Sequence, residues 1–302
     1  MSAGVVTLDE VVGNDAGFVQ ARTPTQLAWG RFKRSRLAIM GVAMLAVIIL
    51  LSVLAPWIAP HGQNEIDLFS IKAPPSREHL LGTDSLGRDV LSRLLYGGRM
   101  SLAIGIAAAL ICTLVGIFFG AIAGYYGGWI DGAIMRFVDL MLAFPSIFLL
   151  LIIAAMFEGI SVWGVILFLG LFSWMWLTRI IRGEFLSLKQ RDFVEAARSI
   201  GTPDGQIIRR HLLPNVIGAI VVTFTLDVAL FMLAEAGLSF LGFGVPPGIP
   251  TWGNMLNESR TDYLSEPLLA VVPGLALTLC VLAFNFVGDG LRDAFDPKGI
   301  RG

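Results

Sequence analysis

Six long runs of apolar residues, separated by shorter polar segments, are the feature that most limits how this chain can fold. A helix needs about 20 predominantly apolar residues to cross the hydrocarbon core of a bilayer. A backbone exposed to lipid must also satisfy its own hydrogen bonds, so each run predicts a transmembrane helix. We therefore expect an all-α polytopic membrane protein with six transmembrane helices. The runs occupy residues 37–59, 100–124, 133–156, 160–178, 214–234 and 267–287.

The composition agrees with this class and excludes others. Only 15% of the 302 residues are charged, against about 25% in soluble proteins, and the mean hydropathy is +0.75. A net charge of −1 gives no overall field that would attract nucleic acid. The two cysteines, Cys112 and Cys280, both lie inside apolar runs. We therefore expect neither a disulfide framework nor a metal site.

The distribution of Lys and Arg predicts which side of the membrane each polar segment faces. Most of the 22 Lys and Arg residues lie before the first run, between the fourth and fifth runs, or after the sixth. Six spans place these three segments on one side, so both termini are predicted to be cytoplasmic. The expected organisation is a cytoplasmic tail and basic interfacial segment (1–36), a first transmembrane helix (37–59), an external loop (60–99), a five-helix core (100–288) with a cytoplasmic loop (179–213), and a C-terminal tail (289–302).

The stretch RDFVEAARSIGTPDGQIIRRHLLPN, residues 191–215, is polar and basic although its surroundings are apolar. Asp192 and Glu195 have the spacing of a capping box. Gly201 stands where a helix ends in the left-handed conformation, and Thr202, Pro203 and Asp204 are typical of the start of a second helix. Helices this short are marginal in water, so something must hold them. The alternatives are a surface hairpin without a partner and a fit into a groove of another protein.

The predicted external loop contains GTDSLGRD, whose glycines and short polar residues favour tight turns. Arg88 is close enough in sequence to pair with Asp84 or Asp89. The motif is either a turn that orders its own loop or part of an outer surface that meets another protein or caps the passage. It is not a nucleotide-binding loop, because no Gly-Lys-Ser/Thr follows it. Its candidate residues are Gly82, Thr83, Asp84, Gly87, Arg88 and Asp89.

Four charged residues within or at the end of the apolar runs are candidates for a transport passage. Arg136 and Asp139 are three residues apart on one helix face, where an ion pair at the inner end of the helix is the simpler alternative. Asp227 lies about 20 Å into the fifth run, and an acid at that depth generally faces a protein interior or water. Glu235 is expected at the outer end of the same run.

Four glycines in and just after the second run, Gly116, Gly120, Gly124 and Gly128, repeat at intervals of four residues. This spacing places hydrogen atoms along one face of a helix and lets another backbone approach closely. We expect a packing surface there rather than a binding site.

Taken together, these residues resemble importer-type ABC permeases. That family carries a cytoplasmic loop of the form Glu-Ala-Ala, three residues, Gly, nine residues, Ile, one residue, Leu-Pro. Here Glu195, Ala196, Ala197, Gly201, Leu213 and Pro214 fit this pattern, and His211 replaces its Ile. The segments 79–102, 135–145, 238–256 and 284–298 are similar to the C-type permease subunit of dipeptide and oligopeptide importers, a group that also serves glutathione and nickel systems.

The resemblance implies a type I ABC importer permease fold in the cytoplasmic membrane of a bacterium or archaeon. It also implies a heterodimer with a homologous B-type permease, two ATP-binding subunits and an extracytoplasmic substrate-binding protein. ATP and Mg²⁺ would be bound by those partners, and this chain by itself would be neither an enzyme nor a cofactor-binding protein. The coupling surface for the ATP-binding subunit would comprise Asp192, Glu195, Ala196, Ala197, Arg198, Gly201, Thr202, Pro203 and Asp204.

Two other functional classes stay open from the residues alone. An ATP-independent secondary transporter or channel would have no use for the cytoplasmic double helix. A structural membrane subunit that anchors a soluble complex is separated from a permease only by the family resemblance. The substrate expected of a permease is an oligopeptide or dipeptide, with glutathione or nickel as the alternatives.

Overall fold

The structure is a computed structural model that describes residues 24–156 and 161–296. The predicted tail residues 1–23 and 297–302, and the start of the fourth predicted run, lie outside the described residues. The described chain is helical and contains no strand. In chain order the first eight helices are α1 Pro24–Phe32, α2 Arg36–Val53, α3 Ala55–Ile58, α4 Val90–Tyr126, α5 Gly128–Leu142, α6 Ser146–Met156, α7 Val162–Leu171 and α8 Met175–Leu188.

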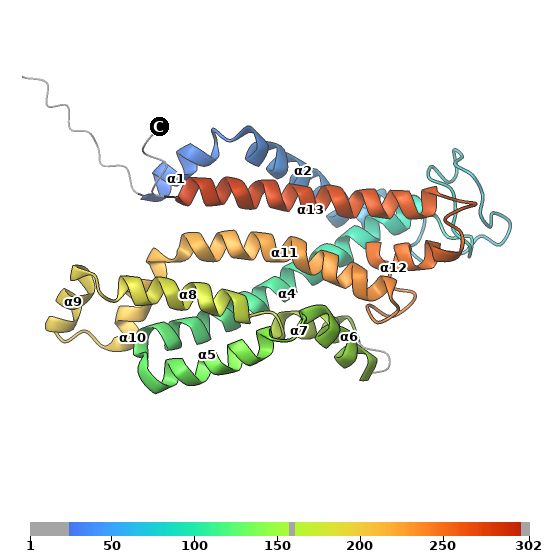
Figure 1. Ribbon diagram of the computed structural model, residues 1–302. Coiled ribbons are helices and arrows are strands. Elements are labelled where there is room, and N and C mark those ends of the chain that lie inside the picture. Colours follow the sequence, from blue (N-terminus) through green and yellow to red (C-terminus); the bar gives the residue numbers. More distant parts are fainter. Residues whose placement is uncertain (1–23, 157–160, 297–302) are drawn as a thin grey trace, which may run out of the picture.

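The second half of the chain begins with short helices and ends with two long ones. A π-helical turn, Ile208–Leu212, and a 3₁₀ turn, Leu213–Asn215, join α10 to α11. Another 3₁₀ turn, Ser259–Thr261, follows α12. The helices are α9 Asp192–Ser199, α10 Asp204–Ile207, α11 Ile217–Phe240, α12 Trp252–Glu258 and α13 Leu268–Phe295. Figure 1 shows an elongated bundle in which α4 crosses obliquely behind α8 and α11.

Five described segments are long and apolar enough to cross a membrane. They confirm five of the predicted runs, although α4 begins ten residues before the predicted start at Met100 and so includes the end of the predicted external loop. The run at 133–156 is not one continuous helix, because the chain leaves helical geometry around Pro145 and forms α5 and α6 instead. Proline removes a backbone donor and clashes with the preceding turn. Six crossings therefore stay a prediction.

The glycine spacing on α4 produces the predicted packing surface. A methyl group on Gly116 would lie 3.0 Å from the Leu177 side chain, and one on Gly120 would lie 2.7 Å from the Cβ atom of Ile181. Gly124 meets Phe185 of α8 in the same way. The expectation is wrong for Gly128, which has nothing within 4 Å and begins α5 with a φ of +57°. The α4–α8 pair is thus held at close backbone distance along three turns.

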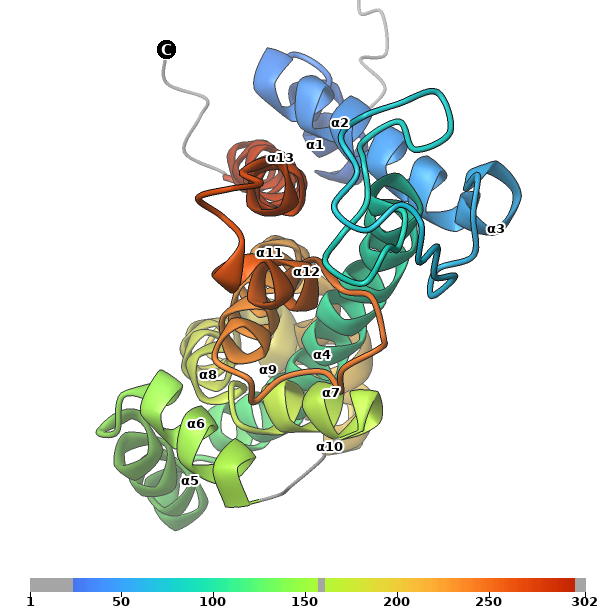
Figure 2. The ribbon, with the colours of Figure 1, turned by 90° about the vertical axis from the view of Figure 1, so that its right-hand side faces the viewer.

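The remaining long helices pack around α4. Figure 2 shows α4 passing between the α2 and α13 side of the bundle and the α5 and α6 side. Gly41 lets α2 approach the Ala283 backbone of α13, and Gly105 of α4 lies against Met232 of α11. The outward faces of α2 and α13 stay apolar and exposed, as at Leu50 and Val271. Apolar exposed helices are what a lipid or membrane-embedded protein surface requires.

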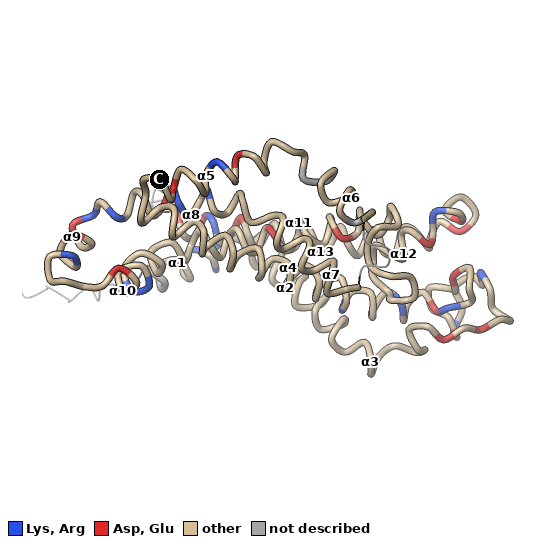
Figure 3. The backbone as a smooth tube through the Cα atoms, turned by 90° about the horizontal axis from the view of Figure 1, so that it is seen from below, with Lys and Arg blue, Asp and Glu red and all other residues tan. Residues whose placement is uncertain are grey.

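Charged residues gather at the two ends of the bundle (Figure 3). One end carries α9, α10, α1 and the C-terminal end of α13, and the other carries α12 and the loop that precedes α4 (Figure 1). This arrangement agrees with the predicted grouping of the basic segments on one side. Which side faces the cytoplasm stays a prediction.

Candidate functional site

The polar stretch forms a helical hairpin that protrudes from one end of the bundle (Figure 1). The inner side of α9 is apolar, since Val194 and Ala197 are buried. They belong to a cluster of buried residues that also includes Ile207, Phe185 and Tyr125. The hairpin is therefore attached to α4 and α8 through side-chain packing, which supplies the stability that helices of eight and four residues lack by themselves.

The corner between α9 and α10 depends on Gly201. Its φ is +77°, a conformation that strains any residue with a Cβ atom. Its N–H donates to the Arg198 carbonyl, and the Thr202 N–H donates to the Ala197 carbonyl. These two bonds satisfy the last carbonyls of α9 as a Schellman motif does. The predicted left-handed helix end is confirmed.

The predicted helix starts are each displaced. Arg191, not Asp192, is the N-cap of α9, and no side chain caps it. The capping-box prediction at Asp192 is therefore wrong. Pro203, not Thr202, precedes the first residue of α10, Asp204. In both places a carboxylate lies in the first turn of the helix, where the helix dipole stabilises it without a capping bond.

The outer side of α9 presents apolar side chains to solvent. Phe193 is 41% exposed and Ile200, at the end of the helix, is 83% exposed. Ala196 lies between them in helical spacing and is also exposed. We call Phe193, Ala196 and Ile200 the α9 ridge. Glu195 and Asp192 are exposed beside it.

Two residues of the predicted coupling set have partners within this chain. The Tyr125 hydroxyl donates a hydrogen bond to Asp204 over 2.6 Å. The Arg198 guanidinium lies 5.4 Å from the centre of the Tyr125 ring. Nearby, the Lys189 ammonium donates to the Gly124 carbonyl at the end of α4. Asp204 and Arg198 therefore fix the hairpin to α4, which leaves the ridge as the outward-facing part.

At the opposite end of the bundle, GTDSLGRD forms an ordered turn. Gly82 and Gly87 have left-handed backbone conformations, and Thr83 pairs with Asp89 as a short antiparallel bridge. Asp84 accepts hydrogen bonds from the Leu86 and Arg88 N–H groups and from the Arg88 guanidinium, the last over 2.7 Å. The predicted Arg88–Asp84 pair is confirmed, and the motif satisfies most of its own polar groups.

The loop that contains this turn is also bound to α12 and to the segment after it, and apart from Arg88 the residues involved were not singled out by the sequence. Glu258 accepts from Arg88 over 2.8 Å and from Arg93 over 2.7 Å, and the Arg93 side chain is almost completely buried. Lys72 donates to Asp262 over 2.7 Å, and this bond holds the Asp262 pKa below its usual value. No spacing in the sequence signals pairs that are 165 or more residues apart.

The four passage candidates do not form one cluster, since no hydrogen bond or ion pair among the described residues joins any two of them. The predicted Arg136–Asp139 pair is wrong: Asp139 binds Arg179 of α8 over 2.5 Å. Asp227 is half-buried, with the Cys112 thiol 3.9 Å from its carboxylate. Glu235 is completely buried and accepts from Ser239 and Thr251, while its other oxygen has no partner in the described chain.

Comparison with known proteins places this arrangement in a family. Residues 116–301 match the family model described as the binding-protein-dependent transport system inner membrane component. Residues 23–75, which include α1 to α3, match the N-terminal transmembrane domain of oligopeptide transport permease C.

Individual relatives and a solved structure agree. The chain is 45% identical over 280 residues to the glutathione transport system permease protein GsiD of Escherichia coli O6:K15:H31 (strain 536), with 92% of each chain covered. The same values hold for GsiD of Shigella boydii serotype 4. The inward-facing MetNI methionine ABC transporter has a TM-score of 0.54 at 19% identity, covering 68% of this chain and 96% of that one, which shows a shared fold. The chain therefore belongs to the family of inner-membrane components of binding-protein-dependent transport systems, as a multi-pass permease that is not an enzyme by itself.

Proposed function

We propose that this permease serves an ATP-driven importer of short peptides, glutathione included, and that the α9 ridge binds the ATP-binding subunit. ATP and Mg²⁺ are then bound by that partner, and this chain converts its movement into opening of the passage. A permease of such a system works with ATP-binding and substrate-binding partners. The proposal adds which residues contact the ATP-binding subunit and which substrate is transported.

The observation that carries the docking proposal is the exposure of the α9 ridge. Ile200 is 83% exposed at the far end of a hairpin whose inner side is well packed. An isoleucine in water forgoes roughly 1.5–3 kcal/mol of burial free energy, which a partner groove would recover. Ala196 lies at the centre of the ridge, where a small side chain allows close approach. Glu195 is positioned at the rim to bind a polar group of the partner.

The substrate proposal follows from the relatives, whose names specify glutathione transport. Glutathione is a tripeptide, so the same passage would suit other short peptides, such as the dipeptides and oligopeptides handled by related importers. In binding-protein-dependent systems an external protein delivers the substrate, which means that selection need not be made by this chain.

A homologous B-type permease as partner is supported by Asp227. A carboxylate within a transmembrane helix costs about 3 kcal/mol unless it faces protein or water. Asp227 is only half-buried by its own chain. A second permease would cover its exposed side or share a water-filled passage with it.

Reconstituted complexes in proteoliposomes test the docking proposal. Ala196→Asp places a charge in the proposed interface, where burying it costs several kcal/mol. We expect this variant to insert normally but to lose co-purification of the ATP-binding subunits, or the stimulation of ATP hydrolysis by the loaded binding protein, and with it uptake. Ala196→Ser, a small polar replacement, should retain all three. Normal docking and stimulated hydrolysis with Ala196→Asp would refute the proposed role of the ridge.

Substrate class and energy source are tested with the wild-type complex. We expect uptake of labelled glutathione or of a short peptide to require ATP inside the vesicles and to be insensitive to ionophores. Competition among glutathione, a dipeptide and a pentapeptide would rank the substrates. Uptake that follows an ion gradient without ATP would instead identify a secondary transporter.

A further inference from the structure

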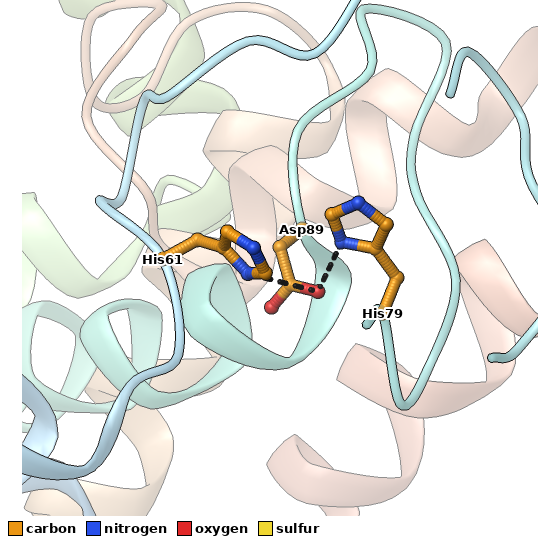
Figure 4. Close-up of side chains that lie close together, drawn as sticks. All are labelled: His61, His79 and Asp89. Atoms are coloured by element: carbon orange, nitrogen blue, oxygen red, sulfur yellow. Dashed lines mark hydrogen bonds and ion pairs between the residues drawn. The ribbon is translucent and has the colours of Figure 1, made fainter. Parts of the chain in front are cut away.

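Two histidines and an aspartate from distant parts of the loop between α3 and α4 lie together at the start of α4 (Figure 4). His61, His79 and Asp89 each offer a ligand atom, and these atoms all lie within 4.8 Å of one another. The imidazole ring centres are 4.6 Å apart. Oδ1 of Asp89 lies 3.0 Å from Nδ1 of His79 and 3.8 Å from Nδ1 of His61. Both imidazole rings thus face one carboxylate oxygen.

The hydrogen bonds of the described chain do not account for this arrangement. Buried polar atoms normally have a hydrogen-bond partner. Nδ1 of His61 and Nε2 of His79 are both buried and have none within the described residues. His79 is only 5% exposed as a residue, so bulk water does not compensate. A simple His79–Asp89 hydrogen bond would satisfy Nδ1 of His79, but His61 is too far from that oxygen to form a hydrogen bond of its own.

We propose that Nδ1 of His61, Nδ1 of His79 and Oδ1 of Asp89 bind a divalent transition-metal ion of the zinc class. Zinc binds imidazole nitrogen and carboxylate oxygen at about 2.0–2.2 Å, so tetrahedral ligands lie about 3.3 Å apart. The observed separations of 3.0 and 3.8 Å bracket that value. Two imidazoles favour zinc, nickel, cobalt or copper over magnesium and calcium, which prefer oxygen ligands. A fourth position is left for water or a donor from another molecule.

Neighbouring groups hold the proposed ligands in position. Oδ2 of Asp89 accepts the Ser92 N–H over 2.7 Å, so its other oxygen is directed at the histidines. The Ser92 hydroxyl oxygen in turn accepts a hydrogen bond from the backbone N–H of His61 over 3.1 Å. A carboxylate oxygen of Asp67 lies 4.0 Å from Nε2 of His79. With a metal on Nδ1, the proton of His79 resides on Nε2 on the side of Asp67, whose carboxylate would have to move closer than 4.0 Å to become the hydrogen-bonded outer carboxylate that metal-bound histidines commonly have. The ion would thus give a partner to Nδ1 of His61 and would fix the proton of His79 on Nε2, the nitrogen nearer Asp67.

Such an ion would tie residues 61 and 79 of the loop to the first turn of α4. The loop lies beside α12 at the end of the bundle opposite the α9 ridge (Figure 1). Metal binding would therefore order a surface on the predicted external side, next to the GTDSLGRD turn. This inference is independent of the transported substrate and of the proposed docking of α9.

Metal binding to the complete transport complex tests the proposal. The complex is treated with chelator, dialysed against buffered Zn²⁺ and analysed for bound zinc. Sites in the partner subunits contribute equally to all variants, so the difference between variants reports on this chain. We expect His61→Gln and His79→Gln each to lose one tightly bound zinc, with affinity lowered at least 100-fold. His211→Gln, which changes the only other histidine, should bind as the wild type does.

Two further measurements keep the test decisive if His79→Gln fails to assemble. Asp67→Asn, at a partly exposed position, should weaken zinc binding about 10–100-fold while keeping the ligands. Co²⁺ in the wild-type complex should give the intense visible absorption of a four-coordinate site, and His61→Gln should abolish it. If the wild-type complex binds no more Zn²⁺ than His61→Gln and its Co²⁺ spectrum stays that of the six-coordinate hydrated ion, the proposal is wrong.

Discussion

Tyr125, one residue before the end of α4, donates a hydrogen bond from its hydroxyl to Oδ1 of Asp204 in α10, over 2.6 Å. This contact joins the long central helix of the bundle to the protruding hairpin. The Tyr125 ring also packs in the same buried cluster as Val194 and Ala197. Movement imposed on the hairpin would therefore be transmitted to α4 directly, and through α4 to its glycine-lined contact with α8.

Tyr125→Phe should loosen this connection without unfolding the chain, because the ring and its packing are retained. A hydrogen bond to a charged group contributes about 1.5–3 kcal/mol. We expect the ATP-binding subunits to stay bound while stimulation of their ATPase by the loaded binding protein falls about tenfold. ATPase assays in proteoliposomes measure this. Tyr126→Phe, at the neighbouring and exposed tyrosine, is the control. Unchanged stimulation with Tyr125→Phe would show that packing alone transmits the movement.

Gly201→Val should weaken coupling more mildly than a charge on the α9 ridge. A Cβ atom at this position meets nothing within 4 Å, so the cost is backbone strain alone. Left-handed backbone costs a residue with a side chain roughly 1–2 kcal/mol. We expect reduced uptake with partial ATPase docking. Gly201→Asn should behave better than Val, since Asn tolerates this conformation. Equal activity of Val and Asn variants would mean that the corner can adopt another conformation.

Gly120→Ala should destabilise the contact between α4 and α8. The added methyl would lie 2.7 Å from the Cβ atom of Ile181 and 2.9 Å from the Thr178 carbonyl oxygen. Overpacking of this kind costs about 1–3 kcal/mol. Thermal unfolding of the purified complex should show a lower midpoint. Gly132→Ala in α5 is the matched control, since nothing lies within 4 Å of its Cβ position. Equal midpoints for the two variants would mean that the helices separate at little cost.

Glu258→Gln should loosen the loop that precedes α4. Glu258 neutralises Arg88 and the buried Arg93, and without it Arg93 keeps only Asp84 at 3.8 Å. Breaking a buried pair costs about 3–5 kcal/mol, and we expect about 2–3 kcal/mol because Glu258 is partly exposed. Hydrogen exchange of the 82–93 amides should accelerate accordingly. Glu266→Gln, in the segment between α12 and α13, should leave the exchange unchanged. Slow exchange in Glu258→Gln would mean that Asp84 alone holds both arginines.

The parts of the fold that could be predicted from the sequence are those fixed by local physics. Apolar runs of bilayer length became helices, and Gly201 took the left-handed conformation that its position indicated. The helix starts expected at Asp192 and Thr202 were each displaced by one residue, because a carboxylate in the first turn and a capping side chain leave similar sequence patterns.

The candidate sites were harder to predict because their partners are distant in the chain. Asp139 is near Arg136 in sequence but binds Arg179, which the packing of α5 beside α8 brings close. Arg182 binds Asp131 across the same pair of helices. His61 and His79 are 18 residues apart without a recognised metal-binding spacing, and only the folded loop brings both to Asp89. A sequence pattern shows local spacing, whereas these pairs depend on tertiary packing.

Asp227 gives the sharpest test of a passage in this chain. It is the charged candidate that lies deep within α11, and the Cys112 thiol lies 3.9 Å from its carboxylate. A carboxylate kept at this depth must face water, substrate or protein, whether the second permease or a neighbouring helix, to offset about 3 kcal/mol. We expect Asp227→Ala to lower uptake at least tenfold while the complex assembles in normal amounts. Asp227→Asn, which keeps the shape and loses the charge, separates a need for charge from a need for hydrogen bonding. Thr223→Ala, one turn earlier on α11, is the control and should transport normally. Wild-type uptake by Asp227→Ala at equal membrane abundance would place this carboxylate in a helix contact that transport does not use.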